Sequence, residues 1–320
     1  MKTRTFLATL LTALLGLTAA RTSAAEKTTT YRVGYNNWIG FLALFVAEEK
    51  GYFKAEGLTV KMKAFSAPGD GLKPLLTGDL DLHLTTLDAT VLAADKAPGK
   101  LKVVTFLDTS AGADAIVAKP EITSPAGLKG RTVGATLGEC NHLLLLKALE
   151  KAGLKESDVK LTSMSPDDAG AAFAAGKLDA AVTWEPWLTK IATAKQGQVI
   201  FSSKDVPNLI VDCATISDGT AAKKSAPTKA FLRALSKANA LILQDPAGCA
   251  KAGVKAFEMK AEEIADLLPK LKLYDAAGSA EMLSGGAAPA VRELATFFKM
   301  SGANTKEIAA EQLLDASFLK

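Results

Sequence analysis

Short apolar runs alternate with longer Ala- and Leu-rich amphipathic stretches along most of this chain, which restricts the fold more than any other feature. Such alternation is typical of an α/β protein with largely parallel sheets. The first round predicts strands at 32–35, 58–65, 80–84 and 101–107, with helices at 41–51, 71–76 and 88–95. The second round predicts strands at 132–135, 159–164 and 180–184, with helices at 141–152 and 167–175.

After residue 228 the pattern changes, and only helices are expected, at 229–243, 246–257, 261–268, 276–298 and 305–310. With 320 residues, of which 48% are hydrophobic and 22% charged, the chain is long enough for two α/β lobes with separate cores. We expect the helical tail to return to the first lobe and cover it. The cleft between the lobes, at the carboxyl ends of the strands, is then the default ligand site.

The first 25 residues have the organisation of a secretory signal peptide. Lys2 and Arg4 precede an apolar run at 6–17, and small residues follow up to Ala25. The apolar run is shorter than the roughly 20 residues of a membrane anchor, although an uncleaved anchor is the alternative. Cleavage would remove three basic residues and no acid, which lowers the net charge from +4 to +1. We therefore expect a periplasmic protein without a lipid anchor, since no cysteine lies near the cleavage region, and without nucleic acid as a partner.

The three cysteines, Cys140, Cys213 and Cys249, leave two interpretations open. Export would permit a Cys213–Cys249 disulfide, whereas buried free thiols are the alternative. With two histidines and no paired cysteine motif, the chain offers no zinc-like spacing. Because it also has no nucleophile elbow and no phosphate-binding loop, we expect no catalytic residue, no metal and no cofactor.

Three stretches carry a family resemblance. They are Gly-Tyr-Asn-Asn-Trp-Ile-Gly at 34–40 with Lys-Gly-Tyr-Phe at 50–53, Gly-Asp-Leu-Asp at 78–81 with Leu-Thr-Thr-Leu-Asp at 84–88, and the segment 171–187 ending in Trp-Glu-Pro-Trp. Over residues 31–246 the chain resembles the periplasmic solute-binding proteins of ABC importers in the nitrate, sulfonate and taurine family.

The resemblance implies a type II periplasmic-binding-protein fold, in which two lobes joined by two crossover strands close on one small molecule. It also implies a monomer that delivers its ligand to an inner-membrane permease with a separate ATPase subunit. On this plan lobe one comprises 26–115, lobe two 116–211, and the return strand and helical tail 212–320.

Candidate ligand-binding residues in lobe one follow its predicted strands. Asn37, Trp38 and Gly40 follow the first strand, where backbone N–H groups and a helix start are available. Trp38 is either a core aromatic or a flat wall of the cleft, and we expect the cleft because a loop end is poorly buried. Thr86 and Asp88 lie in the equivalent turn after the third strand, where Asp88 is equally plausible as a helix cap.

In lobe two, Glu139 and Asn141 precede or begin a helix, where each is a ligand contact or only a helix-end residue. Trp184 and Glu185 end the last strand before Pro186, and with Trp187 they predict an aromatic box around a carboxylate, suited to a cationic nitrogen. Packing at the hinge is the alternative.

The two expected crossovers contribute the last candidates. Ser110 and Asp114 lie at the first crossover and Asp212 at the second. There they either face the cleft or only stabilise the hinge between the lobes.

The charges of these stretches favour one class of ligand. They contain five acids and no arginine, and Arg32 and Arg131 are expected at strand starts away from the cleft. A bare anion would be held poorly there, so we expect an amine-bearing or zwitterionic solute, such as a taurine-like aminosulfonate. The alternatives are a sensor component and a thiamine-pyrimidine-type binding or biosynthetic protein. The enzymes of that type use a cysteine-rich motif, whereas the cysteines here are scattered.

Overall fold

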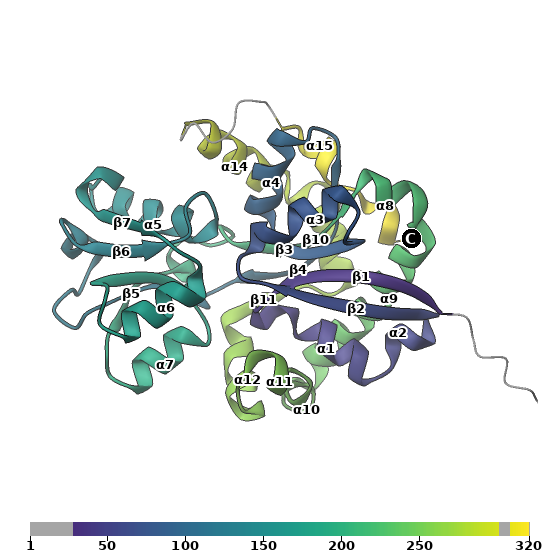
Figure 1. Ribbon diagram of the computed structural model, residues 1–320, viewed down its shortest axis with the longest axis horizontal. Helices are drawn as coiled ribbons and strands as arrows, with labels where there is room; N and C mark the ends of the chain where they lie inside the picture. Colours follow the sequence, from purple (N-terminus) through teal and green to yellow (C-terminus); the bar gives the residue numbers. More distant parts are fainter. Residues whose placement is uncertain (1–27, 301–307, 320) are drawn as a thin grey trace, which may run out of the picture.

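The computed structural model describes residues 28–300 and 308–319, so the expected signal peptide lies outside the described residues. Two α/β lobes lie side by side along the longest axis of the molecule (Figure 1). A six-stranded sheet with order β11-β4-β10-β3-β1-β2 forms the centre of lobe one, and a five-stranded sheet with order β7-β6-β8-β5-β9 forms that of lobe two.

The sheet of lobe one combines the first four strands of the chain with two strands from its second half. β1 is parallel to β2 and β3, whereas β10 is antiparallel to β3 and β4, and β11 is antiparallel to β4. The strands are β1 (Thr29–Asn36), β2 (Leu58–Phe65), β3 (Leu82–Thr86), β4 (Leu101–Ser110), β10 (Val211–Ser217) and β11 (Leu271–Leu273).

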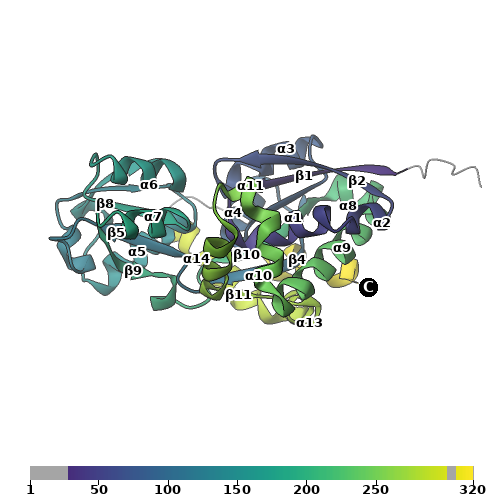
Figure 2. The same ribbon diagram turned by 90° about the horizontal axis from the view of Figure 1, so that it is seen from below.

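Helices cover this sheet on both faces. α9 packs on α1 and α2, whereas α14 packs on α4, and two separate hydrophobic clusters form the core. Helices α8–α13 gather around the first sheet, as expected for a returning tail (Figure 2). The helices are α1 (Leu42–Glu49), α2 (Tyr52–Ala55), α3 (Leu72–Thr77), α4 (Leu87–Lys96), α8 (Asp218–Lys223), α9 (Ser225–Gln244), α10 (Pro246–Ala250), α11 (Val254–Phe257), α12 (Ala261–Leu267), α13 (Ala276–Glu281), α14 (Ala288–Met300) and α15 (Ala310–Leu313).

Lobe two repeats the plan on a smaller scale. β6 is parallel to β7 and β8, and β5 is antiparallel to β8 and β9. Its strands are β5 (Asp114–Ala118), β6 (Thr132–Ala135), β7 (Lys160–Ser163), β8 (Ala180–Trp184) and β9 (Gln198–Ser202), and its helices are α5 (Cys140–Lys151), α6 (Pro166–Ala174) and α7 (Trp187–Thr193).

The chain crosses between the lobes twice, through residues 111–113 after β4 and through residues 206–210 before β10. The Oγ atoms of Ser110 and Ser203 lie 2.8 Å apart, and the Ser110 hydroxyl also accepts a hydrogen bond from the Asp114 amide at 3.2 Å. Ser110 therefore ties the crossing segments together. Because β4 and β10 are neighbours in one sheet, the two crossings lie next to each other at the junction of the lobes.

Several expected elements differ in the structure. β11 interrupts the tail expected to be all helical, because a three-residue strand is too short to leave a period in the sequence. The sheets are less uniformly parallel than expected, since β5 and β10, which follow the crossings, run antiparallel to their neighbours. The helix expected at 276–298 is broken at Gly285, whose φ is 134°. Residues 305–307 of the helix expected at 305–310 lie outside the described residues, and of the other three only Ala310 is helical, as the first residue of α15.

The three cysteines are buried and free, so the Cys213–Cys249 bridge is not formed. Cys213 lies on β10 in one hydrophobic cluster of lobe one, and Cys249 lies on α10 in the other. Of the two interpretations the buried thiols are correct. Within the part of the chain that the structure describes, no helix has the length and apolar character needed to span a membrane.

Candidate ligand-binding cleft between the lobes

A narrow cavity lies where the lobes meet, and it is closed so tightly that it has no free room for a water-sized molecule. Both lobes and both crossings contribute to its wall, which consists of Asn36, Trp38, Thr86, Asp114, Cys140, Trp184, Ile210 and Asp212. Five of the expected site residues are in this set. Since side chains from both lobes close over the cavity, a solute enters only when the lobes separate.

The lobe-one side of the cavity follows from strand ends and helix starts. Asn36 ends β1, and Thr86 ends β3 and caps α4, where its Oγ1 accepts from the Ala89 amide at 3.5 Å. β1 and β3 are parallel neighbours, so their carboxyl ends meet at the same edge of the sheet. This edge faces lobe two.

Two tryptophans face each other across the junction. The rings of Trp38 in lobe one and Trp184 in lobe two have centroids 6.0 Å apart and an interplanar angle of 51°. The indole N–H of Trp38 donates to Asp108 at 3.2 Å, and that of Trp184 donates to Asp167 at 2.9 Å. Trp38 was expected to be either a core aromatic or a wall of the cleft. It is both, because it lines the cavity and also packs in a core cluster of lobe one.

Three buried carboxyl groups lie at the crossings. Asp108 on β4 and Asp212 on β10 are paired in register, so the two buried side chains lie on neighbouring strands. Asp114 begins β5. The Oδ2 atom of each of the three has no hydrogen-bond partner among the described residues.

Burial dominates the electrostatics of these groups. It raises the pKa of Asp114 to about 7, against a hydrogen bond from Ser110, and raises the pKa of Asp108 to about 7, against a hydrogen bond from the Trp38 indole. Burial followed by the charges of Asp108 and Asp114 holds the pKa of Asp212 well above its usual range. Each ionised carboxylate here therefore costs free energy unless a cation compensates it.

Two further carboxyl groups lie at helix starts. Asp88 is in the first turn of α4, and burial raises its pKa to about 6. Glu139 is the N-cap residue of α5, and burial together with the Asp88 charge raises its pKa to about 8. Its Oε1 accepts from the Gly69 amide of lobe one at 3.2 Å, so Glu139 joins the lobes as well.

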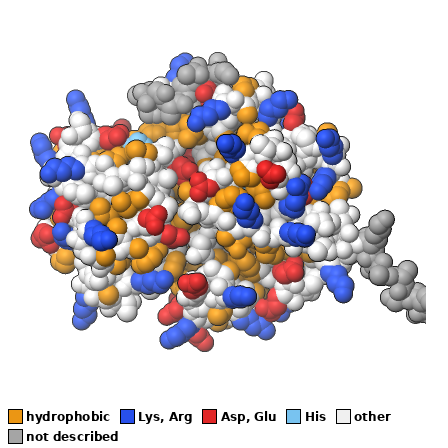
Figure 3. Space-filling model, in the orientation of Figure 1, with side chains coloured by type: hydrophobic (Ala, Val, Ile, Leu, Met, Phe, Trp, Pro, Cys, Tyr) orange, Lys and Arg blue, Asp and Glu red, His pale blue; other side chains and the backbone are white. Residues whose placement is uncertain are grey.

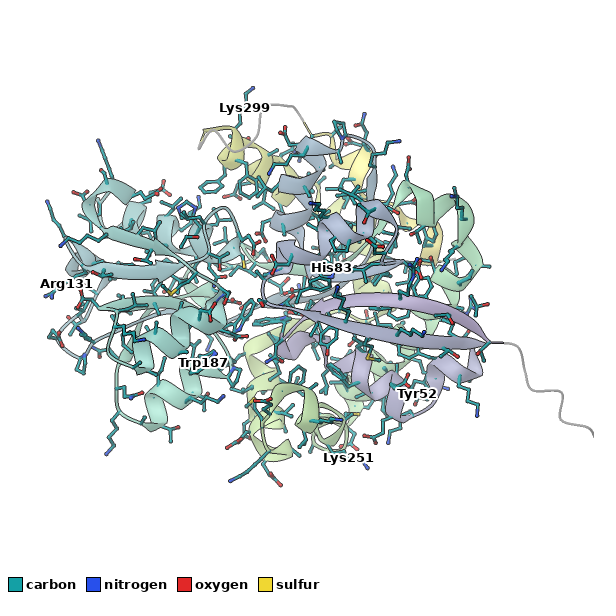
Figure 4. All side chains as sticks on the ribbon, viewed as in Figure 1. Tyr52, His83, Arg131, Trp187, Lys251 and Lys299 are labelled. Atoms are coloured by element: carbon teal, nitrogen blue, oxygen red, sulfur yellow. The ribbon has the colours of Figure 1, made fainter. Side chains whose placement is uncertain are left out.

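Basic side chains lie away from this cluster or are paired. Arg32 forms an ion pair with Asp81 at 2.6 Å, and Arg131 lies at the outer end of lobe two (Figure 4). Lys and Arg side chains are spread over the outer surfaces of both lobes, and acidic side chains lie both on these surfaces and near the junction (Figure 3). The groups that shift the pKa values of the five carboxyls are other carboxyls and hydrogen-bond donors.

The expected aromatic box differs in one essential residue. The carboxylate between the two indoles is Asp167 of α6, not Glu185, because its Oδ1 accepts from Trp184 at 2.9 Å and from Trp187 at 3.0 Å. Glu185 is fully buried, and its carboxylate pairs with Lys270 of lobe one. Glu185 thus contributes an ion pair between the lobes and lies outside the cavity wall.

The strand β8 ends at Trp184, before Pro186 as expected, and a helix that the sequence analysis did not expect follows directly. Pro186 is the N-cap residue of α7, and the helix begins directly at Trp187. The ring of Trp187 lies on the side of lobe two that is nearer to lobe one (Figure 4).

The remaining candidates lie around the cavity rather than in its wall. Asn37 is half-buried, and its Oδ1 has no partner among the described residues. Asn141 is fully buried on α5, and its Nδ2 likewise lacks a partner there. A side chain at Gly40 would collide with Asp108 and Trp38, so Gly40 permits their contact.

Sequence reasoning missed Asn36, Asp108, Asp167, Cys140 and Ile210. A signal existed for Asp108, since this acid directly follows the mostly apolar run at 101–107, where that strand was expected to end. Asp167 carried no signal, because its partners lie 17 and 20 residues further along the chain. Within the described residues, no three His, Cys, Asp or Glu side chains are grouped so as to hold a metal ion.

Comparison with known proteins identifies the family. A family model described as "NMT1/THI5 like" matches residues 38–249, which is more than half of the chain. The chain belongs to the NMT1/THI5-like family. A binding protein of Brucella abortus is 33% identical over 200 residues, or 62% of this chain and 60% of the relative. An aliphatic sulfonates-binding protein of Escherichia coli is 31% identical over 196 residues, or 59% of each chain.

These relatives of the NMT1/THI5-like chain are binding proteins, which confirms the resemblance expected from the sequence. The alignments span about 60% of the relatives' length. The alkanesulfonate-binding protein of Xanthomonas axonopodis pv. citri, solved with bound MOPS, matches with a TM-score of 0.75 and 21% identity, over 91% of this chain and 98% of that one. The expected periplasmic-binding-protein fold is confirmed.

Proposed function

We propose that this chain is the solute-binding component of an ABC importer and that it captures one small organic solute between its lobes. The observation that carries the proposal is the cavity whose wall comes from both lobes, beside which buried polar atoms lack partners. A solute that contacts both walls favours the closed arrangement over the open one. Its relatives include binding proteins named for sulfonates, which supports the same role.

The proposed solute is amine-bearing or zwitterionic. Five carboxyl groups lie at or around the cavity, and the pKa values of four of them are raised to between about 6 and about 8. A nitrogen that carries positive charge or N–H donors would relieve both their repulsion and their desolvation. Trp38 and Trp184 add aromatic faces that attract such a nitrogen.

The proposal includes export to the periplasm, where the protein acts as a monomer. It hands the solute to an inner-membrane permease driven by an ATPase subunit. Residues 1–25 support export because they have the organisation of a signal peptide.

A thermal-shift screen of residues 26–320, refolded to remove any co-purified solute, tests this function. The panel comprises taurine, alkanesulfonates, nitrate, quaternary amines, amino acids, ureas and pyrimidines, since a compound that binds only the folded state raises the melting temperature. We expect a shift with an amine-bearing compound and no turnover of that compound. Turnover of the compound would indicate an enzyme. A melting temperature that no compound of the panel raises would contradict the proposed role as a solute-binding component.

A further inference from the structure

The unpartnered atoms next to the cavity are mainly hydrogen-bond acceptors. Asn36, Asp114 and Asp212 line the cavity, and each has a buried side-chain oxygen without a partner among the described residues. Asn36 is only 2% exposed, so its free Oδ1 is a second signal for a donor that is independent of the carboxyl groups. The nearby indole N–H groups already donate to Asp108 and Asp167. A ligand that donates hydrogen bonds would therefore satisfy the unpartnered oxygens of the cavity wall.

The helix starts, which would otherwise favour an anion, already face carboxyl groups of the chain itself. Asp88 is buried in the first turn of α4, and neither of its carboxyl oxygens has a hydrogen-bond partner among the described residues. Glu139 occupies the N-cap position of α5. A helix N-terminus stabilises negative charge, and at both of these helix starts a carboxyl group of the protein itself occupies that place. A sulfonate at either helix start would compete with these side chains.

The magnitudes decide between a cation and an anion. A unit charge 4 Å from a carboxylate interacts with it by roughly 4 kcal/mol at an effective dielectric constant of about 20. Asp114 and Asp212 line the cavity, and an ammonium group beside them would favour the ionised form of each, whereas a sulfonate would be repelled by each carboxylate that is ionised. Asp108 lies behind Asp212 and adds to the same sign. The part of the chain that the structure describes has no grouping suited to a metal ion, which leaves an organic cation.

We propose that the cleft selects an organic solute of net positive charge and rejects sulfonates, with Asp114 and Asp212 as the residues that bind the cationic nitrogen. The inference rests on the proposed function, because it assumes that a solute binds between the lobes. It narrows that function to one class, since a zwitterion with a sulfonate group is excluded. Asp108 is a positioning residue, because it accepts a hydrogen bond from the Trp38 indole and is the register partner of Asp212.

The test uses a bacterial small-molecule extract separated by charge at pH 7. A cation exchanger retains net cations, an anion exchanger retains sulfonates and other net anions, and the flow-through contains neutral molecules and zwitterions. Each fraction is added to the refolded protein, and the melting temperature is measured. We expect stabilisation by the cationic fraction alone. If the anionic or the flow-through fraction raises the melting temperature and the cationic fraction does not, the proposed charge selectivity is overturned. If none of the three fractions raises the melting temperature, the proposed function is overturned.

Asp114→Asn and Asp266→Asn are matched variants for the same experiment. Asn keeps the shape of the side chain and removes its charge, and Asp266 is an exposed residue of α12 far from the cavity wall. We expect Asp114→Asn to weaken binding of the cationic fraction at least about tenfold, which is 1.4 kcal/mol. Asp266→Asn should bind like the wild type. Equal binding by Asp114→Asn and the wild type would overturn the role of Asp114, even if both variants fold normally.

Discussion

Asp114→Asn should stabilise the solute-free protein at alkaline pH and destabilise it at acid pH. Burial raises the pKa of Asp114 from 3.8 to about 7. The folded protein therefore holds this proton more tightly than the unfolded chain does. Its contribution to stability is largest below the unfolded pKa and declines as the pH rises from about 4 to about 7. The decline amounts to about 4 kcal/mol, since one pKa unit corresponds to about 1.4 kcal/mol.

The asparagine variant avoids this decline but introduces an amide N–H₂ group that has to find acceptors. An unmatched buried donor costs about 1–3 kcal/mol. At pH 8 the variant should therefore be more stable than the wild type by about 1–3 kcal/mol, and at pH 4 less stable by a similar amount. Urea unfolding of the solute-free protein at pH 4, 6 and 8 measures the difference.

The change of sign is what tests the reasoning. Asp266→Asn, in contrast, should stay within about 0.5 kcal/mol of the wild type at each pH, as expected for an exposed substitution. If Asp114→Asn is destabilised equally at pH 4 and pH 8, Asp114 does not carry an uncompensated buried charge. The electrostatic account of the cleft would then be wrong.

Three further predictions concern contacts elsewhere in the structure. Lys270→Met leaves Glu185 buried without its ion-pair partner, so the closed arrangement should weaken by about 2 kcal/mol and small-angle scattering should report a larger radius of gyration; an unchanged radius would exclude a role of this pair in closure. Asp167→Ala removes the acceptor of two indole N–H groups and should cost about 2–4 kcal/mol in urea unfolding, with a change in tryptophan fluorescence; unaltered stability and fluorescence would argue against these hydrogen bonds. The three thiols are free and buried, so they should react with a thiol reagent only after unfolding, and a reductant should leave the melting temperature unchanged; a shift with reductant would reveal a disulfide.

The fold could largely be predicted from the sequence, because the strands and helices of each lobe are marked by the spacing of apolar residues within short stretches of the chain. The strand at 58–65 and the helix at 261–268 are marked by nearby residues, and the structure has β2 and α12 there. β11 was missed because its three residues become a strand only through pairing with β4, far earlier in the chain. The break at Gly285 was missed because the apolar spacing continues on both sides of it.

The sequence predicted only those site residues whose positions follow from the ends of the strands. Asp114 and Asp212 were expected at the crossings, and the structure places both in the cavity wall. Pairing between distant side chains could not be predicted from the sequence, since Lys270, the ion-pair partner of Glu185, lies 85 positions later in the chain. Two tryptophans flanking an acid in sequence suggested a box around that acid, but the carboxylate of Glu185 pairs with Lys270 of the other lobe. The box closes on Asp167 instead.

Native mass spectrometry tests the central claim most directly. The refolded protein is incubated with an unfractionated small-molecule extract, repurified and measured intact, and the bound molecule is then released and identified by its accurate mass. The account predicts one molecule per chain with a basic nitrogen and no sulfonate group. A bound molecule that carries a sulfonate group, with or without a basic nitrogen, would contradict the account of the acidic cleft, and a protein that binds nothing would contradict its role as a solute-binding component.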